Sequence, residues 1–344
     1  MKNTWYDDTV YSEFKGKRYL KDTLKCDVLV VGGGLAGLSL LYNLKKNNVD
    51  AVLIEEKQIG SGASGRNGGF CLSGWAQDYD ILLKYLSKEE VVALDQIATS
   101  GVQWMKEKCL SKGYEHTNLQ LGVLKCFLSN NIQKVKKDVA TQNQLFGQNE
   151  EFIDKQKLRN YLCSDKYSCG VLREDSFQFH PLNFMKALAK DCITLGASIF
   201  ENCKFIKYCR NNGKIDSSVS NENRISKIQS EKIVFATGGY GGKEIKELKN
   251  YWLPIKTFIG VTMPMEEELQ AVIKKPMGFS DNRRAGNYYR VLPGNRLSWG
   301  RGISAVGDFT PSKLKQAISR EINYFFPDLR NVEIDYAWSG NMAY

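Results

Sequence analysis

Residues 26–37 read Cys-Asp-Val-Leu-Val-Val-Gly-Gly-Gly-Leu-Ala-Gly, and this stretch decides the fold of the first part of the chain. Its first six residues are mostly apolar and rich in valine, which is typical of a buried parallel strand. A helical pattern covers 35–44, and a second apolar run over 50–55 ends on an acid. Strand, glycine turn, helix, strand and acid in this order predict a βαβ unit that binds a dinucleotide.

The glycines of this G-x-G-x-x-G motif have different tasks. Gly32 permits the tight turn after the strand, Gly34 lets a pyrophosphate approach the backbone, and Gly37 lets the helix pack closely on the strand. Leu35 and Ala36 begin the helix, whose free N–H groups and positive dipole end attract phosphates. The structural alternative is a glycine-rich turn of no chemical meaning, and the complete βαβ pattern argues against it.

Glu55 ends the second apolar run, 18 residues beyond Gly37. An acid at this place accepts hydrogen bonds from the hydroxyls of the adenosine ribose, and it disfavours the 2′-phosphate of NADP. The motif alone does not distinguish NAD from FAD. At this point the sequence predicts an adenine dinucleotide and leaves the choice between these two open.

Residues 62–69, Gly-Ala-Ser-Gly-Arg-Asn-Gly-Gly, follow the acidic strand. They resemble the flavin-proximal loop of the D-amino-acid-oxidase-like FAD-dependent oxidoreductases, and they are similar in particular to the γ-glutamylputrescine oxidase branch. Glycines allow close packing against a flat ring, while Ser64, Arg66 and Asn67 can donate hydrogen bonds to phosphate or flavin oxygens. The alternative is a flexible surface loop. The resemblance implies that the dinucleotide is FAD.

The resemblance extends from Trp5 to the end of the chain. It implies that the backbone of Phe205 meets the adenine, that residues 236–238 form a second dinucleotide contact, and that Trp338 packs near the flavin. Motif and resemblance together predict a cofactor site without a metal, formed by Gly32, Gly34, Leu35, Ala36, Gly37, Glu55, Glu56, Ser61, Ala63, Ser64, Arg66, Asn67, Gly68, Gly69, Phe205, Ala236, Thr237, Gly238 and Trp338.

The fold class that follows is α/β (α+β overall), with an FAD-binding Rossmann-like βαβ domain and a discontinuous, antiparallel-sheet substrate domain. We expect the FAD-binding domain at 1–90, 178–245 and 333–344, and the substrate domain at 91–177 and 246–332. Members of the family continue beyond the last of these strands. The resemblance therefore implies a chain truncated at its C-terminus, with weakened affinity for FAD.

The activity that the resemblance implies is oxidation of a C–N bond in an amine or amino acid. A neutral amine passes a hydride from its α-carbon to flavin N5, the imine hydrolyses, and dioxygen reoxidises the flavin. A γ-glutamylputrescine-like substrate is favoured. Two alternatives stay open: a dehydrogenase that passes electrons to a carrier, and a truncated, non-catalytic flavin-binding paralogue.

The catalytic candidates come from the segment that resembles the hairpin covering the flavin face, and they are Tyr288, Arg290 and Trp299. Arg290 can hold a substrate carboxylate with two parallel hydrogen bonds. The alternative for Arg290 is a surface salt bridge, and the alternative for each aromatic residue is packing in the core.

The composition excludes several classes of protein. The 344 residues carry a net charge of +10, from 48 basic and 38 acidic residues. Because the lysines are scattered and often adjoin acids, we expect a solvated surface rather than a nucleic-acid partner. No run of about 20 apolar residues predicts a transmembrane helix. Nine cysteines without a Cys-x-x-Cys pair, and only two histidines, argue against a metal cluster and predict a reducing compartment, the cytoplasm.

Overall fold

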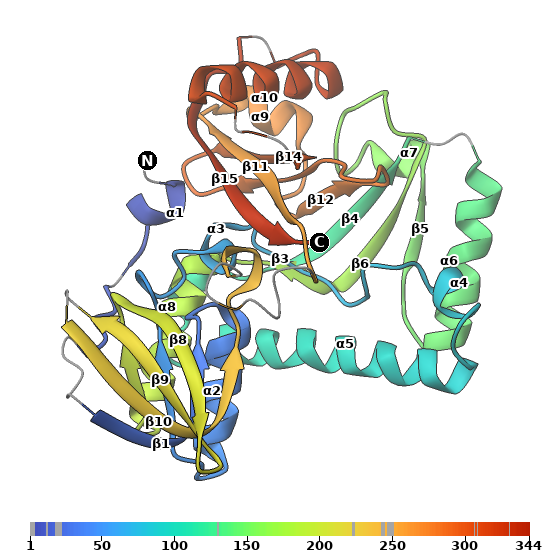
Figure 1. Ribbon diagram of the computed structural model, residues 1–344. Coiled ribbons are helices and arrows are strands. Elements are labelled where there is room, and N and C mark those ends of the chain that lie inside the picture. The colour runs from blue at the N-terminus through green and yellow to red at the C-terminus, as the bar shows by residue number, and fades with distance from the viewer. Residues whose placement is uncertain are drawn as a thin grey trace.

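The computed structural model describes residues 4–11, 13–17, 23–128, 131–221, 224–241, 245, 251–305, 307, 309–329 and 331–344. These residues form two β-sheets with helices packed on them, one sheet above the other in Figure 1. The predicted combination of a Rossmann-like sheet with a second sheet is confirmed. Across the described ranges, no helix combines the length and the apolar character needed to cross a bilayer.

The smaller sheet contains the predicted βαβ unit. Its parallel strands lie side by side in the order β7 (Ser198–Phe200), β2 (Ala51–Ile54), β1 (Thr23–Val31) and β10 (Arg224–Phe235). Two antiparallel strands, β9 (Lys214–Asn221) and β8 (Cys203–Asn211), extend the sheet beyond β10. The central strands are apolar on both faces because separate hydrophobic clusters cover the two faces.

Two neighbouring helices cover one face of this sheet. α2 (Leu35–Lys46) connects β1 to β2, and α8 (Pro181–Thr194) packs beside it. α8 begins at His180, whose side chain accepts a hydrogen bond from the N–H of Asn183, with a proline at the first helical position. These signals fix where α8 begins. They therefore also fix the position of His180, which lies beside the second sheet.

The long helix α5 (Lys88–Leu110) begins at a capping box formed by Ser87 and Glu90. Its last turns pack into the same cluster as α2 and α8 through Val102 and Met105. The sequence prediction assigned 91–177 to the substrate domain, whereas the last turns of α5 pack with the unit that contains the smaller sheet. The reason is that its apolar side chains complete the core of the smaller sheet.

The larger sheet is mixed. Across the sheet the strands are β15 (Ile334–Ala343), β11 (Pro254–Thr262), β14 (Arg296–Ser304), β13 (Tyr288–Leu292), β12 (Gly278–Asp281), β4 (Gln120–Phe127), β6 (Cys169–Gln178) and β3 (Phe70–Cys71), and β5 (Glu151–Asp154) also pairs with β6. All pairs are antiparallel except β12 with β4, whereas the sequence predicted an antiparallel sheet. A parallel pair is possible here because many other elements lie between β4 and β12 in the chain, so no tight turn forces these strands to run in opposite directions.

One face of the larger sheet is the core of the second unit. α10 (Pro311–Phe325) covers this face, as Figure 1 shows. Tyr289 stacks between Phe279 and Trp299 there, with ring centroids 5.4 Å and 4.4 Å away. The opposite face of the sheet is left for the cofactor-binding unit.

β15 also belongs to the larger sheet. It pairs with β11 from Pro254↔Ala343 to Thr262↔Ile334. The sequence prediction placed 333–344 in the FAD-binding domain, so the strand differs from that assignment. Continuous backbone pairing with β11 is the physical reason, although one face of β15 still contacts the cofactor-binding unit through Trp338.

The other helices are short, apart from α6. They are α1 (Trp5–Asp8), α3 (Ala63–Arg66), α4 (Tyr79–Leu82), α6 (Ile132–Phe146), α7 (Lys155–Leu158) and α9 (Glu267–Val272), and 3₁₀ turns cover Glu115–Thr117 and Gly238–Tyr240. α1 and α3 matter for function because both lie where the two units meet.

Candidate cofactor and substrate site

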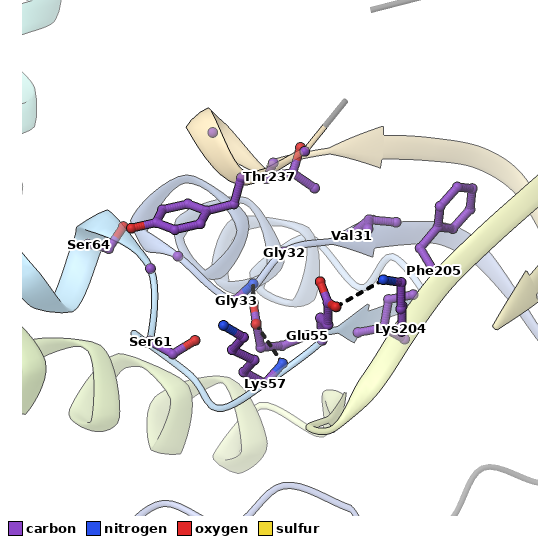
Figure 2. A pocket seen from close by; sticks show the side chains of 18 of the residues that line it. Val31, Gly32, Gly33, Glu55, Lys57, Ser61, Ser64, Lys204, Phe205 and Thr237 are labelled. Atoms are coloured by element: carbon purple, nitrogen blue, oxygen red, sulfur yellow. Dashed lines mark hydrogen bonds and ion pairs between the residues drawn. The ribbon is translucent and has the colours of Figure 1, made fainter. Parts of the chain in front are cut away.

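A cavity of about 360 Å³ opens at the carboxyl ends of β1 and β2, the edge at which open α/β sheets bind ligands. Figure 2 shows Ser64 and Phe205 at its two ends and Glu55 between them. The predicted cofactor residues that line it are Gly32, Gly34, Glu55, Glu56, Ser61, Ala63, Ser64, Phe205, Ala236, Thr237 and Gly238. Sequence positions from four separate segments therefore converge on one cavity.

The glycine turn leaves no room for larger side chains. Gly32 has a φ of +114°, and a Cβ built on it would lie 2.6 Å from the carbonyl oxygen of Ala236. A Cβ on Gly37 would collide with the carbonyl oxygen of Gly32. Gly32 therefore lets the turn pass close to the end of β10, and Gly37 permits the close approach of α2 to β1 that the sequence predicted.

The N-terminus of α2 points toward the loop that follows the acidic strand. Gly34 is the N-cap of α2 and offers no side-chain hydrogen bond. Instead, the hydroxyl of Ser64 accepts a hydrogen bond from the N–H of Leu35 at 2.9 Å. A hydroxyl can accept this bond and still donate its own proton, so Ser64 can donate to an anion at the helix N-terminus.

Glu55 is held by the backbone on both sides. Its Oε2 accepts a hydrogen bond from the N–H of Gly33 at 2.7 Å, and its Oε1 accepts one from the N–H of Lys57 at 2.9 Å. Burial raises the pKa of this carboxyl, and the two backbone N–H groups oppose that rise. A carboxylate offers about four acceptor sites, so Glu55 keeps capacity for ribose hydroxyls.

Several lining residues were missed by sequence reasoning, namely Lys57, Gly62, Cys203, Lys204, Tyr240 and Gly241. Lys204, labelled in Figure 2, forms an ion pair with Glu56 at 3.1 Å. The signal for each was its position within three residues of one that had been identified. For example, Lys204 adjoins Phe205, and Tyr240 follows the glycine turn after β10.

The remaining predicted cofactor residues do not line this cavity. They are Leu35, Ala36, Gly37, Arg66, Asn67, Gly68, Gly69 and Trp338. Those beyond α3 lie instead against the free face of the larger sheet. The indole N–H of Trp338 donates to the carbonyl oxygen of Arg66 at 2.9 Å, and Asn67 accepts a hydrogen bond from the N–H of Gly69 at 2.8 Å. The loop therefore bridges the cavity and the second sheet.

The glycines of this loop touch two of the three catalytic candidates. A Cβ on Gly68 would lie 2.6 Å from the ring of Tyr288, and a Cβ on Gly69 would lie 2.9 Å from Arg290 Cζ. Tyr288 and Arg290 share one face of β13 because side chains alternate along a strand. The loop, Tyr288 and Arg290 thus form one continuous wall.

Trp299 lies on the other face of the sheet. It pairs directly with Tyr289 across β13 and β14, so it points into the core with Tyr289 and away from Tyr288. Its side chain is fully buried. The structure therefore does not bring Trp299 to the wall that contains Tyr288 and Arg290. Its position agrees with the alternative considered for this residue, packing in the core.

Arg290 is buried without an acidic partner among the residues that the structure describes. It is 5% exposed. Its Nη2 donates to the hydroxyl of Tyr6 at 3.0 Å, and its Nε has no hydrogen-bond partner. Buried charges are normally paired, so this guanidinium has unused capacity to hold an anion. A surface salt bridge, the alternative considered for Arg290, is not what the structure contains.

His180 next to Arg290 is neutral. Its Nδ1 accepts from the N–H of Asn183 at 3.1 Å, so the ring proton is assigned to Nε2, which donates to the hydroxyl of Thr9 at 3.1 Å. Burial, and then the charge of Arg290, lower the pKa of His180 from 6.5 to about 3. His180 is a helix cap rather than a base. Among the described residues, no cluster of histidine, cysteine or carboxylate side chains has a metal-binding arrangement.

The fold and the site define a dinucleotide-binding protein with a Rossmann-like sheet and a second, mixed sheet. The chain belongs to the family of FAD-dependent oxidoreductases, because the sequence model of that family, described as FAD dependent oxidoreductase, matches residues 27–344. It is an FAD-dependent oxidoreductase of the amine and amino-acid oxidase family. The glycine turn, Ser64 and Glu55 fit this cofactor, since their donors and acceptors match phosphates and ribose hydroxyls.

Two curated relatives cover most of the chain. The probable oxidoreductase OrdL of Haemophilus influenzae is 29% identical, over 91% of this chain and 72% of its own length. The γ-glutamylputrescine oxidoreductase of Escherichia coli is 26% identical, over 94% of this chain and 75% of its own. The predicted similarity to the γ-glutamylputrescine oxidase branch is confirmed at the level of the family.

Solved structures share the fold. An L-amino acid deaminase from Proteus vulgaris superposes with a TM-score of 0.74 at 19% identity, covering 97% of this chain and 82% of that one. A glycine oxidase from Bacillus cereus gives a TM-score of 0.68 at 19% identity, covering 92% and 83%. At these identities the likeness concerns the fold alone.

Proposed function

We propose that the protein oxidises the C–N bond of an amine whose molecule also carries a carboxylate, as γ-glutamylputrescine does. Bound FAD supplies the hydride acceptor: the amine carbon loses a hydride, the resulting imine takes up water to give an aldehyde and ammonia, and dioxygen takes up the two electrons as hydrogen peroxide. The similarity to the E. coli γ-glutamylputrescine oxidoreductase supports this substrate class.

The observation that carries the proposal is the guanidinium of Arg290. It is buried, its Nε has no partner, and it lies against Gly69 of the loop that bridges to the cofactor cavity. A carboxylate matches the geometry and the charge of a guanidinium. Burial strengthens such a pair because few water molecules compete with it. Arg290 is therefore the residue that we assign to the substrate carboxylate.

Tyr288 closes the site on the same face. Its ring is wedged between Gly68 and Gly300, where a Cβ would collide with it. Burial raises the pKa of its phenol far above neutral pH, so Tyr288 stays protonated and does not serve as a base. Its role in the proposal is to exclude water and to shape the space over the loop.

The cofactor cavity would hold the adenosine and pyrophosphate part of FAD. Glu55 would accept from the ribose hydroxyls, and Ser64 with the N-terminus of α2 would face the phosphates. The flavin would then lie toward Arg66 and Gly68, beside the wall that this loop forms with Tyr288 and Arg290. The bridging position of the loop supports this direction.

A substrate panel tests the proposal. FAD-loaded protein is mixed with γ-glutamylputrescine, putrescine and α-amino acids, and flavin bleaching without air and peroxide release in air are both measured. Preference for the amine that carries a carboxylate is expected. Equal rates with putrescine would remove the role of Arg290, and bleaching without peroxide would identify the protein as a dehydrogenase that uses an electron carrier.

We also propose a cytoplasmic location. All nine cysteines are free, and seven are buried as small apolar side chains. Burial raises the pKa of Cys71 and of Cys203 to about 12, so these thiols stay protonated and slow to react. Cell fractionation with an antibody against the native chain tests the location, and recovery of the protein outside the cytoplasm would contradict it.

A further inference from the structure

The N-terminal helix α1 contacts the wall that the loop forms with Tyr288 and Arg290. It lies outside the segment that the family model matches, which begins at residue 27. Tyr6 on this helix is fully buried. Its hydroxyl oxygen accepts a hydrogen bond from Arg290 Nη2 at 3.0 Å, across 284 positions of sequence. No other side chain among the described residues forms a hydrogen bond with this guanidinium.

Four residues are too few for a helix that is stable by itself, so other contacts must hold α1. A capping box does so at its start: the N–H and hydroxyl of Thr4 donate to Asp7 at 2.7 Å and 2.9 Å. At its end, the hydroxyl of Thr9 donates to the carbonyl oxygen of Trp5 at 2.7 Å. The helix therefore has a defined orientation in the folded chain.

The ring of Tyr6 is fixed by three aromatic neighbours. Its centroid lies 5.0 Å from His180, 5.7 Å from Trp338 and 5.6 Å from Trp5, in edge-to-face arrangements with each. Trp338 in turn is bonded to the loop through Arg66. The phenol therefore cannot swing away from Arg290 without disturbing the wall of the site.

We infer that Tyr6 is a positioning residue for Arg290, an inference that rests on the proposed function. The Tyr6 hydroxyl binds one end of the guanidinium and leaves Nε free for a carboxylate. A long arginine side chain has several rotamers, and a carboxylate binds in parallel geometry to only one orientation of its plane. Tyr6 holds that orientation before the substrate binds. Less conformational entropy of the arginine side chain is therefore lost on binding, and substrates with a carboxylate are favoured.

The test compares Tyr6→Phe with a matched control. Tyr6→Phe removes only the hydroxyl and keeps the ring. Tyr336→Phe also removes a phenol that binds α1, since Tyr336 donates to Asp8 at 2.9 Å, but Tyr336 does not touch Arg290. Both variants are loaded with FAD, and kcat and KM are measured for γ-glutamylputrescine and for putrescine.

We expect Tyr6→Phe to raise the KM for γ-glutamylputrescine about tenfold, the scale of one hydrogen bond to a charged group. Its kcat, and the KM for putrescine, should stay as in the wild type. Tyr336→Phe should change neither KM. Equal KM increases for both substrates in Tyr6→Phe would mean a purely structural role and overturn the inference, as would no change.

A binding measurement separates this inference from the proposed function. Glutarate, a dicarboxylate without an amine, is titrated into each protein by calorimetry, which needs no turnover. Weaker glutarate binding by Tyr6→Phe than by Tyr336→Phe supports the positioning role even if the wild type oxidises none of the amines. Identical dissociation constants for the two variants overturn it even if the amine is a substrate.

Discussion

The hydroxyl of Ser64 accepts a hydrogen bond from the N–H of Leu35 at 2.9 Å, which joins two sequence motifs that are 29 positions apart. A Cβ on Gly34 would lie 2.8 Å from this hydroxyl oxygen, so the contact depends on a glycine at that position. The N-terminus of α2 and the loop after the acidic strand therefore form one preorganised surface. A direct protein–protein hydrogen bond therefore fixes the two sides of the phosphate-binding region relative to each other.

Replacing Gly37 by alanine should damage this surface. The new Cβ would meet the carbonyl oxygen of Gly32, a backbone atom that cannot move aside easily. We expect a loss of about 1–3 kcal/mol in the free energy of unfolding and less FAD per chain. Gly101→Ala is the control, because nothing lies within 4 Å of a Cβ there; it should stabilise α5 slightly. Urea denaturation and flavin absorbance measure both, and equal midpoints would contradict the prediction.

Glu55→Gln should weaken FAD binding. The carboxylate accepts from two backbone N–H groups at once, those of Gly33 and Lys57. An amide offers one acceptor and one donor, so one N–H would face another donor. We expect the dissociation constant for FAD to rise roughly tenfold or more. Glu151→Gln breaks an exposed ion pair with Lys157 away from the cavity and should change it little. Fluorescence titration of FAD into the two apoproteins measures both dissociation constants. Similar dissociation constants for the two variants would refute the assignment of Glu55 to FAD binding.

The βαβ unit was predictable because its signals are local. Gly37 packs against Gly32 of the same motif, so spacing alone identifies that contact, whereas the neighbour of Gly32 is Ala236, which follows a strand far along the chain. The direction in which Trp299 points was also accessible from sequence. A three-residue hairpin at 293–295 pairs Leu292 with Arg296, and the same register then places Trp299 opposite Tyr289. Counting along that register places Trp299 on the face opposite that of Tyr288 and Arg290.

The contact between Tyr6 and Arg290 was not predictable in this way. It joins a four-residue helix at the start of the chain to a strand 284 positions later, and no periodicity or spacing relates the two. The same holds for β15, whose pairing with β11 depends on how the whole sheet is assembled. Long-range pairing of this kind is decided by tertiary packing, which local patterns do not encode.

The two faces of the larger sheet should respond differently to substitution. Arg290→Lys keeps the charge but loses the planar fork, so we expect the KM for γ-glutamylputrescine to rise about 10- to 100-fold. Trp299→Phe removes part of a side chain that is fully buried in the core. It should lower the free energy of unfolding by roughly 1–3 kcal/mol and leave KM unchanged. Steady-state kinetics and urea denaturation measure the two effects, and a raised KM in Trp299→Phe alone would contradict the assignment of faces.

His180 should make the stability of the protein depend on pH. Burial and the nearby charge of Arg290 lower its pKa from 6.5 to about 3 in the folded chain. Between these values the unfolded chain binds more protons than the folded chain, so stability rises with pH across the window and is lost as the pH falls below 6.5. The slope should reach at most about 1.4 kcal/mol per pH unit.

The variant His180→Asn isolates this contribution, because asparagine also caps a helix but does not titrate. Urea denaturation of both proteins at pH 7.5, 6 and 4.5 measures the difference between their unfolding free energies. The wild type should lose its advantage over the variant as the pH falls, since only the wild type must keep an imidazole neutral beside Arg290. A difference that stays constant with pH would mean that folding does not change the pKa of His180, and it would contradict the prediction.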